Sequence, residues 1–415
     1  MTKASRRRGG PHVLIIVQNL SVPLDRRVWL ECQTLVRAGY RVSVICPRGA
    51  GDSSYTELDG VRIHRYAPAP AARGILAYGF EFAYCWLRAL VLTWRIHRAE
   101  PLAVIQGCNP PDTYWALALL FRRAGVRFVF DHHDLCPELY DSKPGEPSRW
   151  VRWLLRWLER RTFATADLVL TTNESYRERA SARTDRPADE IVVVRSGPDP
   201  AKMRRGTPEP DLRNGRTYLA CYLGVMNPQD GVDVVVRAAD HLVHGLGRDD
   251  VQVALLGDGD CGEELRRQAS ALGLDDYVTF TGMVGSAEIE RWLSTADVGL
   301  SPDPYTVFND VSTMNKTLEY MAYGLPVLAF RLTETAVSAG PAGEYVAVWS
   351  DEGDEAHRFG DALIGLLDDP ERRATMGAAG RERIEKSLGW PASAAVYLAA
   401  YDRLTGRHLS LVSAA

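Results

Sequence analysis

The chain has 415 residues, of which 46% are apolar and 25% charged, and its formal net charge is −4. This is the composition of an ordinary globular protein with room for two or three domains. The seven cysteines form no C-x-x-C pair and no His/Cys metal spacing, which argues against a disulfide scaffold or a structural zinc site and favours a reducing compartment. No stretch reaches the roughly 18 apolar residues that a membrane span needs, because Arg88 interrupts the best candidate, 82–94.

The charge is divided unevenly along the chain. Residues 1–205 carry 32 Lys and Arg against 21 Asp and Glu, a net charge of +11, whereas residues 206–415 carry −15. We expect the first half to face an anionic surface, and we rank a membrane before a nucleic acid because no nucleic-acid motif is present. The predicted location is the cytoplasm, with peripheral contact on the inner face of the membrane and no nucleic-acid partner.

Short apolar runs alternate with helical patterns along the whole chain, which predicts strand–helix–strand units and parallel sheets. In the first half we expect strands at 12–17, 41–46, 61–66, 103–106, 127–130, 168–171 and 191–194. In the second half we expect strands at 217–223, 251–256, 278–280, 298–301, 326–329 and 345–348. The predicted fold class is therefore α/β, with two doubly wound parallel sheets.

Segment 204–216, between the two series, holds two prolines and two glycines and is predicted to be a hinge. The domains are then 1–205 and 206–389. The C-terminal helical segment, 390–415, could pack back on either domain, and we assign it to the first. Two α/β domains of similar size place the ligand in a cleft between them.

The stretch 312–326 carries the most specific pattern. Ser312 or Thr313 can cap a helix, and Gly324 can end it in the left-handed conformation. The free N–H groups of the first helical turn, at the positive end of the helix dipole, form a site for phosphate.

Two charged residues lie three apart on one face of this predicted helix, Lys316 and Glu319. Lys316 adds a positive charge for a phosphate, and Glu319 can accept two hydrogen bonds from the vicinal hydroxyls of a ribose. Together they predict a nucleotide site. The alternative is an amphipathic helix whose Lys and Glu are solvated, and spacing alone favours neither.

Residues 257–262 match G-x-G-x-x-G between a predicted strand and a predicted helix, which in isolation indicates a dinucleotide-binding oxidoreductase. However, Asp258, Asp260, Glu263 and Glu264 would crowd the place of a pyrophosphate. We favour a tight strand-to-helix turn that lines the cleft.

Segment 130–138 reads F-D-H-H-D-L-C-P-E and follows a predicted strand, at the end where α/β sheets place ligand contacts. His132 and His133 are adjacent in extended backbone, so they point opposite ways, and no third ligand stands at a metal spacing. We favour a sugar- or phosphate-facing His133, with a histidine satisfied in the core as an equal alternative.

Segment 149–161 is a basic helical pattern. Trp150, Trp153 and Trp157 fall on one stripe with two leucines, while four arginines fall on another. This pattern is typical of a helix in a membrane interface, and a core-packing helix with a solvated arginine face is at least as common.

Taken together, these residues resemble the retaining glycosyltransferases of family 4, which share the GT-B fold of two facing Rossmann-like domains. The resemblance is carried by Pro23–Trp29, Asp131–Glu138, Val194–Pro198, Leu223–Met226, Leu255–Gly259, Phe280–Gly282 and, most strongly, Asn315–Val327. The branch it resembles most is that of bacterial enzymes that build surface polysaccharide and O-antigen. Glu319 matches the second glutamate of the family's E-x7-E motif, which holds the ribose of the donor.

The chain departs from this family in two places. The first glutamate of E-x7-E should stand at 311, where the chain has Val311. Either Asp310 substitutes for it, or Lys316 and Asn315 have taken over the donor contacts. In addition, segment 224–231 lacks the Arg and Lys that usually hold the diphosphate, so Lys316 must carry more of that charge.

The resemblance implies transfer, with retention, of a hexose or acetamido-hexose from a nucleoside diphosphate sugar, preferably UDP-linked, to a glycan, lipid-linked or small-molecule acceptor. No cofactor and no metal are expected. Domain 1–205 then binds the acceptor and domain 206–389 the donor. The predicted catalytic residues are Lys316, His133 and Asp310, and the predicted donor-binding residues are Glu319, Asn315, Met314, Thr313, Ser312, Gly224, Gly257 and Met283.

Three other functions stay open at this point. A family member with Val311 in place of the glutamate could be a non-catalytic, nucleotide-binding partner subunit. An NAD-dependent oxidoreductase would rest on 257–262, and a related GT-B sugar-nucleotide epimerase would need no acceptor.

Overall fold

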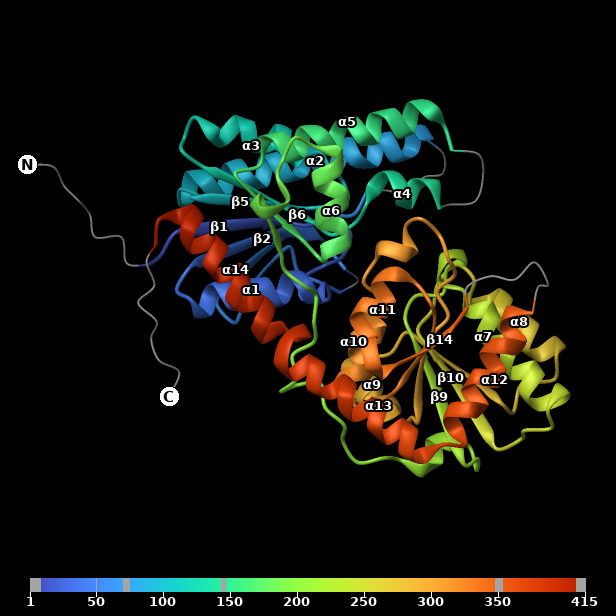
Figure 1. Ribbon diagram of the computed structural model, residues 1–415. Helices are drawn as coiled ribbons and strands as arrows, with labels where there is room; N and C mark the ends of the chain where they lie inside the picture. Colours follow the sequence, from blue (N-terminus) through green and yellow to red (C-terminus); the bar gives the residue numbers. More distant parts are fainter. Residues whose placement is uncertain (1–8, 50, 70–74, 143–146, 348–353, 408–415) are drawn as a thin grey trace, which may run out of the picture. The chain divides into compact units, whose positions relative to one another are not determined.

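The computed structural model describes residues 9–49, 51–69, 75–142, 147–347 and 354–407 (Figure 1). The chain divides into two compact units: unit 1 is Met1–Val194 with Ser393–Ala415, and unit 2 is Arg195–Ala392. Each is an α/β unit built on a largely parallel sheet. The cleft between two domains stays a prediction.

Unit 1 contains an eight-stranded sheet in the order β3-β4-β2-β1-β5-β6-β7-β8, parallel except for the pair β3 and β4. Its strands are β1 (His12–Ile16), β2 (Arg41–Pro47), β3 (Tyr55–Leu58), β4 (Val61–Tyr66), β5 (Val104–Cys108), β6 (Arg127–His132), β7 (Leu168–Thr171) and β8 (Ile191–Val193). Its helices are α1 (Arg26–Arg37), α2 (Ile75–Ala99), α3 (Tyr114–Arg122), α4 (Cys136–Asp141), α5 (Arg149–Thr165), α6 (Glu174–Arg183) and η1 (Ala188–Glu190).

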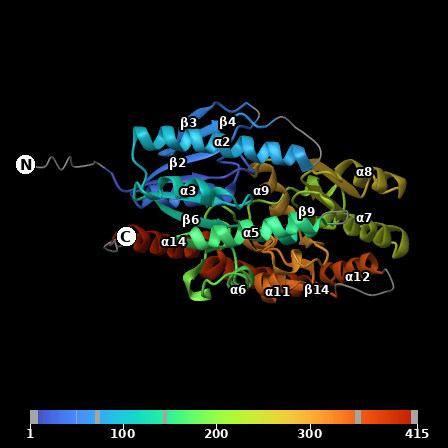
Figure 2. The ribbon, with the colours of Figure 1, turned by 90° about the horizontal axis from the view of Figure 1, so that it is seen from above.

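The connections of this sheet sort its helices onto two faces. After α1 the chain moves from β1 to β2, whereas α2, α3 and α5 each carry it in the opposite direction across the sheet. Because such crossovers are right-handed, α2, α3 and α5 cover one face and α1 the other. Figure 2 shows α2, α3 and α5 side by side over the sheet.

Unit 2 contains a six-stranded, fully parallel sheet in the order β11-β10-β9-β12-β13-β14. Its strands are β9 (Tyr218–Leu223), β10 (Val251–Leu256), β11 (Val278–Gly282), β12 (Val298–Ser301), β13 (Val327–Phe330) and β14 (Gly343–Val346). Its α-helices are α7 (Val232–Asp240), α8 (Gly262–Ala271), α9 (Ser286–Thr295), α10 (Asn315–Ala322), α11 (Thr333–Ala339), α12 (Glu355–Leu367) and α13 (Pro370–Arg383). Shorter helical turns are η2 (Pro210–Arg213), η3 (Pro228–Asp230), η4 (His241–Gly245), η5 (Asn309–Val311), η6 (Gly340–Ala342) and η7 (Ile384–Leu388).

The α/β class and the two parallel sheets are confirmed, because the inner strands are continuous apolar runs buried on both faces. Every strand expected from the sequence is present to within a few residues, although residue 348 of the last one lies outside the described residues. The strand missed was β3, which is polar, exposed and antiparallel at the edge of its sheet.

The expected hinge at 204–216 is wrong. Arg205 donates hydrogen bonds to the carbonyls of Ser294 and Ala296, and Arg213 pairs with Asp297 at 2.6 Å. These contacts pack the segment onto unit 2, so the chain leaves unit 1 earlier, after Val194. The prolines and glycines of 204–216 therefore belong to a connection packed on unit 2. They do not mark the point at which the chain passes from unit 1 to unit 2.

The final helix, α14 (Trp390–Thr405), begins in unit 2 and continues into unit 1. Within unit 1, the buried hydroxyls of Tyr397 and Tyr401 both donate to the side-chain oxygen of Gln106 on β5, from Tyr397 at 2.8 Å. Tyr40 donates to Asp402 at 2.8 Å. Among the helices that the structure describes, none is long and apolar enough to cross a membrane.

We expect the double variant Tyr397→Phe, Tyr401→Phe to destabilise the protein by about 1–3 kcal/mol, because it leaves the buried Gln106 oxygen without a donor. Chemical unfolding followed by circular dichroism measures the change. Tyr305→Phe is the control, since Tyr305 is 53% exposed. An unfolding free energy equal to that of the wild type would contradict the role given to these hydroxyls.

Candidate functional site

The carboxyl ends of the strands of unit 2 bring several predicted donor-binding positions together. A Cβ placed on Gly257 would lie 1.9 Å from the carbonyl oxygen of Gly224, and the Gly257 amide donates to Gly282 at 3.1 Å. The loops after β9, β10 and β11 therefore lie side by side, with Met283 exposed on the last of them. Gly257 is required here for close backbone approach, which supports the strand-to-helix turn over the dinucleotide site.

Lys316 lies against the first of these loops. Its ammonium donates to Asp303 at 2.6 Å, and its Cε lies 3.3 Å from the position of a Cβ on Gly224. The ammonium also lies 5.0 Å from the centre of the Tyr222 ring. Its side chain is only 9% exposed, so Lys316 does not project into bulk water. An ammonium has three donors, of which Asp303 uses one.

Sequence reasoning missed Asp303, which follows β12 and is 2% exposed. Its second oxygen accepts from Ser301 at 2.6 Å. A signal was present in the alternation of proline and acid at 302–304, directly after a buried strand. Only the fold brings this carboxylate to an amine thirteen residues further along the chain.

The helix that carries Lys316 starts later than expected. It is α10, its N-cap is Met314, and no side chain caps it. The expectation that Ser312 or Thr313 caps it is wrong, because the Ser312 hydroxyl donates back to Phe308 at 2.7 Å. Without a side-chain cap, the N–H groups of the first turn at Asn315 remain available to an anion.

Asp310 has a structural contact that the sequence did not suggest. One carboxylate oxygen accepts from the amide of Thr333 at 2.8 Å, and the other accepts from its hydroxyl at 3.0 Å. Asp310 therefore caps the start of α11, and Asp303 is the acid that contacts Lys316. Glu319 is half-buried on α10, one turn beyond Lys316.

In unit 1, a second polar cluster lies at the carboxyl ends of β5 and β6, centred on the fully buried Asp131. Arg27 donates to one oxygen of Asp131 at 2.7 Å, and Gln106 donates to the other at 3.1 Å. Gln106 also donates to the buried Glu31 at 2.7 Å. Burial opposes ionisation of Asp131, but Arg27 and His133 hold its pKa well below the usual value.

His133 is fixed by this carboxylate. Its Nε2 lies 2.7 Å from Asp131, and its side chain is 16% exposed. Arg27 Nε lies 3.0 Å from the same nitrogen. Both contacts engage Nε2, which leaves Nδ1 as the nitrogen for a ligand.

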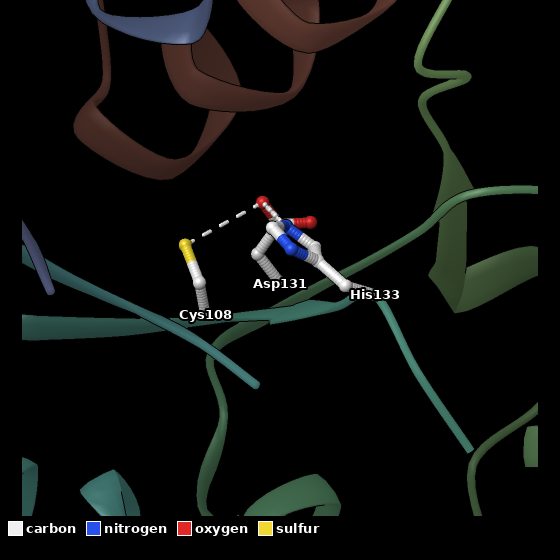
Figure 3. Close-up of side chains that lie close together, drawn as sticks. All are labelled: Cys108, Asp131 and His133. Atoms are coloured by element: carbon white, nitrogen blue, oxygen red, sulfur yellow. Dashed lines mark hydrogen bonds and ion pairs between the residues drawn. The ribbon is translucent and has the colours of Figure 1, made fainter. Parts of the chain in front are cut away.

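Figure 3 shows Cys108, Asp131 and His133, whose potential ligand atoms all lie within 4.8 Å of one another. Such a set could hold a metal ion by composition. However, the Arg27 guanidinium already contacts both Asp131 and His133, and burial raises the pKa of the Cys108 thiol. A divalent cation would meet a resident positive charge and a protonated thiol, so these residues do not fit one.

His132, by contrast, belongs to the apolar core. It is fully buried, and neither ring nitrogen has a hydrogen-bond partner among the described residues. Its ring packs at about 5 Å from Phe130 and Phe163. Burial lowers its pKa to about 3, so the ring is neutral. The adjacent histidines thus face opposite ways, as the extended backbone predicts.

Asp112 lies before α3 and is 3% exposed. Asn109 donates to one of its oxygens at 3.0 Å, and the other oxygen has no hydrogen-bond partner in the described structure. Burial raises the pKa of Asp112 to about 7.

The chain thus has two parallel-sheet units, and each carries a polar cluster at the carboxyl ends of its strands. This is the scaffold of a GT-B glycosyltransferase. Residues 24–197 match the family model of the glycosyl transferase 4-like domain, and residues 217–369 match that of the glycosyl transferases group 1. The chain belongs to the family 4 glycosyltransferases.

Curated relatives agree with this assignment. The chain is 31% identical over 252 residues to a D-inositol 3-phosphate glycosyltransferase of Catenulispora acidiphila, which covers 54% of this chain and 56% of that one. It is 28% identical over 376 residues to the GDP-mannose-dependent alpha-(1-6)-phosphatidylinositol monomannoside mannosyltransferase of Mycolicibacterium smegmatis, covering 83% and 92%. The chain spans about half the length of the first curated relatives it matches.

Solved structures share the fold. Sucrose-phosphate synthase from Thermosynechococcus elongatus has a TM-score of 0.74 at 19% identity, covering 96% of this chain and 100% of that one. The Anabaena protein HepE in complex with UDP-glucose has a TM-score of 0.68 at 15% identity, covering 96% and 100%.

We expect the contribution of Asp112 to the stability of the protein to fall as the pH rises from about 4 to 7. A carboxyl with a raised pKa keeps its proton longer in the folded than in the unfolded chain, so its contribution is full at low pH and is lost through this range. The variant Asp112→Asn lacks this loss, so its unfolding free energy should gain a few kcal/mol on that of the wild type between pH 5 and pH 8.

Urea unfolding at the two pH values measures this gain, with Asp249→Asn, at an exposed position, as the control. Parallel pH curves for the wild type and Asp112→Asn would show that Asp112 ionises normally.

Proposed function

We propose that the protein is a retaining glycosyltransferase that moves a hexose or acetamido-hexose from a nucleoside diphosphate sugar to an acceptor hydroxyl. The observation that carries this proposal is Lys316, held by Asp303 at the uncapped start of α10 and against the glycine loop of β9. Family membership supports the sugar transfer, and the resemblance to retaining enzymes supports the stereochemistry.

The charge on the leaving group determines the role of Lys316. As the glycosidic bond breaks, negative charge grows on the β-phosphate, and the two free donors of the ammonium with the first amides of α10 can stabilise it. Asp303 fixes the position of the ammonium before the donor binds. The leaving phosphate can itself take the proton of the acceptor hydroxyl in a front-face displacement, so no protein nucleophile is required.

The choice of lysine at this position supports a phosphate contact. The chain has 49 Lys and Arg, and only five of them are lysines. Lysine carries a compact charge, whereas the guanidinium of arginine needs a wider, planar site. The compact ammonium lies beside Gly224 and Tyr222.

The remaining predicted residues have roles that follow from this one. Glu319 holds the ribose, Ser312 to Asn315 face the diphosphate, and Gly224, Gly257 and Met283 border the donor. His133, fixed by Asp131, contacts the sugar through Nδ1. No cofactor or metal takes part, and residual activity in EDTA equal to the untreated rate is the expected result.

For the nucleotide we propose UDP, as the resemblance implies. The second candidate is GDP-mannose, because the Mycolicibacterium smegmatis relative, which covers 83% of this chain, is named as GDP-mannose-dependent. Its name also favours a lipid-linked acceptor among the acceptor classes. We place the reaction at the inner face of a membrane, in the synthesis of a surface glycan.

A donor panel tests the proposal as a whole. Thermal shift with UDP, GDP and ADP and their sugar conjugates should show stabilisation by one nucleotide family, and nuclear magnetic resonance should show that the product keeps the anomeric configuration of the donor. Firm nucleotide binding without transfer or hydrolysis of any donor would indicate the non-catalytic partner subunit. Product formed without an acceptor would indicate an epimerase.

We expect Lys316→Ala to lower turnover by about a hundredfold or more, because it removes a donor aimed at the leaving phosphate. Steady-state kinetics with the donor that the panel identifies measures this loss of turnover. Lys202→Ala, an exposed lysine of the same unit, should behave as the wild type.

Lys316→Ala also leaves Asp303 buried without its partner, which could lower activity through misfolding. The double variant Lys316→Ala, Asp303→Asn removes that charge. It should regain stability and still lack turnover. Recovery of turnover in the double variant would overturn the role of Lys316.

A further inference from the structure

The outer helical layer of unit 1 exposes large apolar side chains that the glycosyltransferase reaction does not use. They lie on α2, α3 and α5, and the most exposed are Trp150 at 78%, Leu120 at 61%, Phe80 and Trp153 at 59%, and Leu87 at 55%. On α1, at the opposite face of the sheet, no described large apolar residue is exposed. Exposed apolar side chains gathered on one helical layer mark an interaction site.

These side chains form one surface. The three helices cover the same face of the sheet, and α3 touches α5 where the rings of Trp115 and Trp157 meet at 5.8 Å. On α2, Leu87, Val91 and Trp94 follow one another at helical spacing on the solvent side. On α5, Trp150, Trp153 and Trp157 do the same. Figure 2 views this layer from above.

The same three helices carry a positive charge, which indicates what kind of partner this surface binds. The three helices contain nine arginines and two glutamates, and one of the glutamates, Glu159, is 1% exposed. Along α5, Arg149, Arg152, Arg156 and Arg160 follow the flank of the tryptophan stripe. A second copy of the chain would bring this positive surface against itself, which like charges oppose. Tryptophan with arginine suits the boundary between lipid headgroups and acyl chains.

We propose that the solvent face of α2, α3 and α5 binds an anionic phospholipid surface, with the tryptophans at the level of the headgroups and the arginines against their phosphates. This inference rests on the membrane location proposed above and assigns it to one surface. The basic charge of the first half and the exposed tryptophans are independent features of the chain, and they coincide on these three helices.

The orientation of the layer relates it to the site. Each of the three helices follows the carboxyl end of one strand and leads to the amino end of the next, so α5 begins at the edge of the sheet where β6 ends in Asp131–His133. Trp150, in the first turn of α5, lies toward that edge. A protein bound through this face holds the His133 edge of unit 1 next to the lipid surface, where a lipid-linked acceptor presents its hydroxyl.

Sedimentation with lipid vesicles tests the proposal on the full chain without any donor. The wild type should bind vesicles of phosphatidylcholine with 30% phosphatidylglycerol at low salt, bind pure phosphatidylcholine at least about tenfold more weakly, and lose most binding at high salt. The variant Trp150→Ser, Trp153→Ser should bind the anionic vesicles at least about tenfold more weakly, with an unchanged melting temperature. Leu246→Ser, which alters a residue of unit 2 that is 47% exposed, is the matched control.

Anionic-vesicle binding by the tryptophan variant equal to that of the wild type would overturn the proposal. So would a dimer in solution that the same two substitutions dissolve, because a second copy would then cover the face. Donor binding, measured separately by thermal shift, should be the same in the variant and the wild type. Loss of vesicle binding and failure of the transferase proposal are therefore distinguishable.

Discussion

The fully buried carboxylate of Asp131 is the constraint on which the polar edge of unit 1 depends. A charge in this position costs several kcal/mol unless it is paired, and Arg27 supplies the pair at 2.7 Å. The same guanidinium donates to the carbonyl of Val194, the last residue before the chain leaves the unit, at 2.6 Å. Gln106 connects Asp131 to the two tyrosines of α14. One ion pair thus fixes His133 and both segments through which the chain enters and leaves unit 1.

Unit 2 also buries an ion pair, but with the roles of acid and base exchanged. Here the buried acid, Asp303, holds a lysine that remains available to a ligand, whereas in unit 1 the buried arginine holds an acid that orients a histidine. In both cases the basic partner comes from a helix, Lys316 from α10 and Arg27 from α1, and the acid lies at the carboxyl end of a parallel strand. Both pairs lie at the carboxyl ends of strands, where parallel α/β sheets place their ligand contacts.

Much of the fold could be predicted from the sequence, because buried parallel strands are continuous apolar runs and need no partner to be recognised. Strand β3 was not predicted, because an exposed, polar edge strand has no continuous apolar run. The helix at Lys316 could be predicted from its composition, but its first residue could not, since the hydroxyls at 312 and 313 bond elsewhere. The ion pairs Lys316–Asp303 and Arg27–Asp131 could not be predicted from the sequence. Their partners are thirteen and 104 residues apart, and no helix or strand periodicity relates residues at such spacings.

The path of α14 has a consequence for the order in which the chain folds. The strands of unit 1 precede unit 2 in the chain and α14 reaches unit 1 after it, so the Gln106 oxygen meets Tyr397 and Tyr401 only when all of unit 2 has been synthesised. Unit 2 is a single continuous stretch and can be completed before that moment. Of the two units, the one whose strands are synthesised first is therefore the one that is completed last.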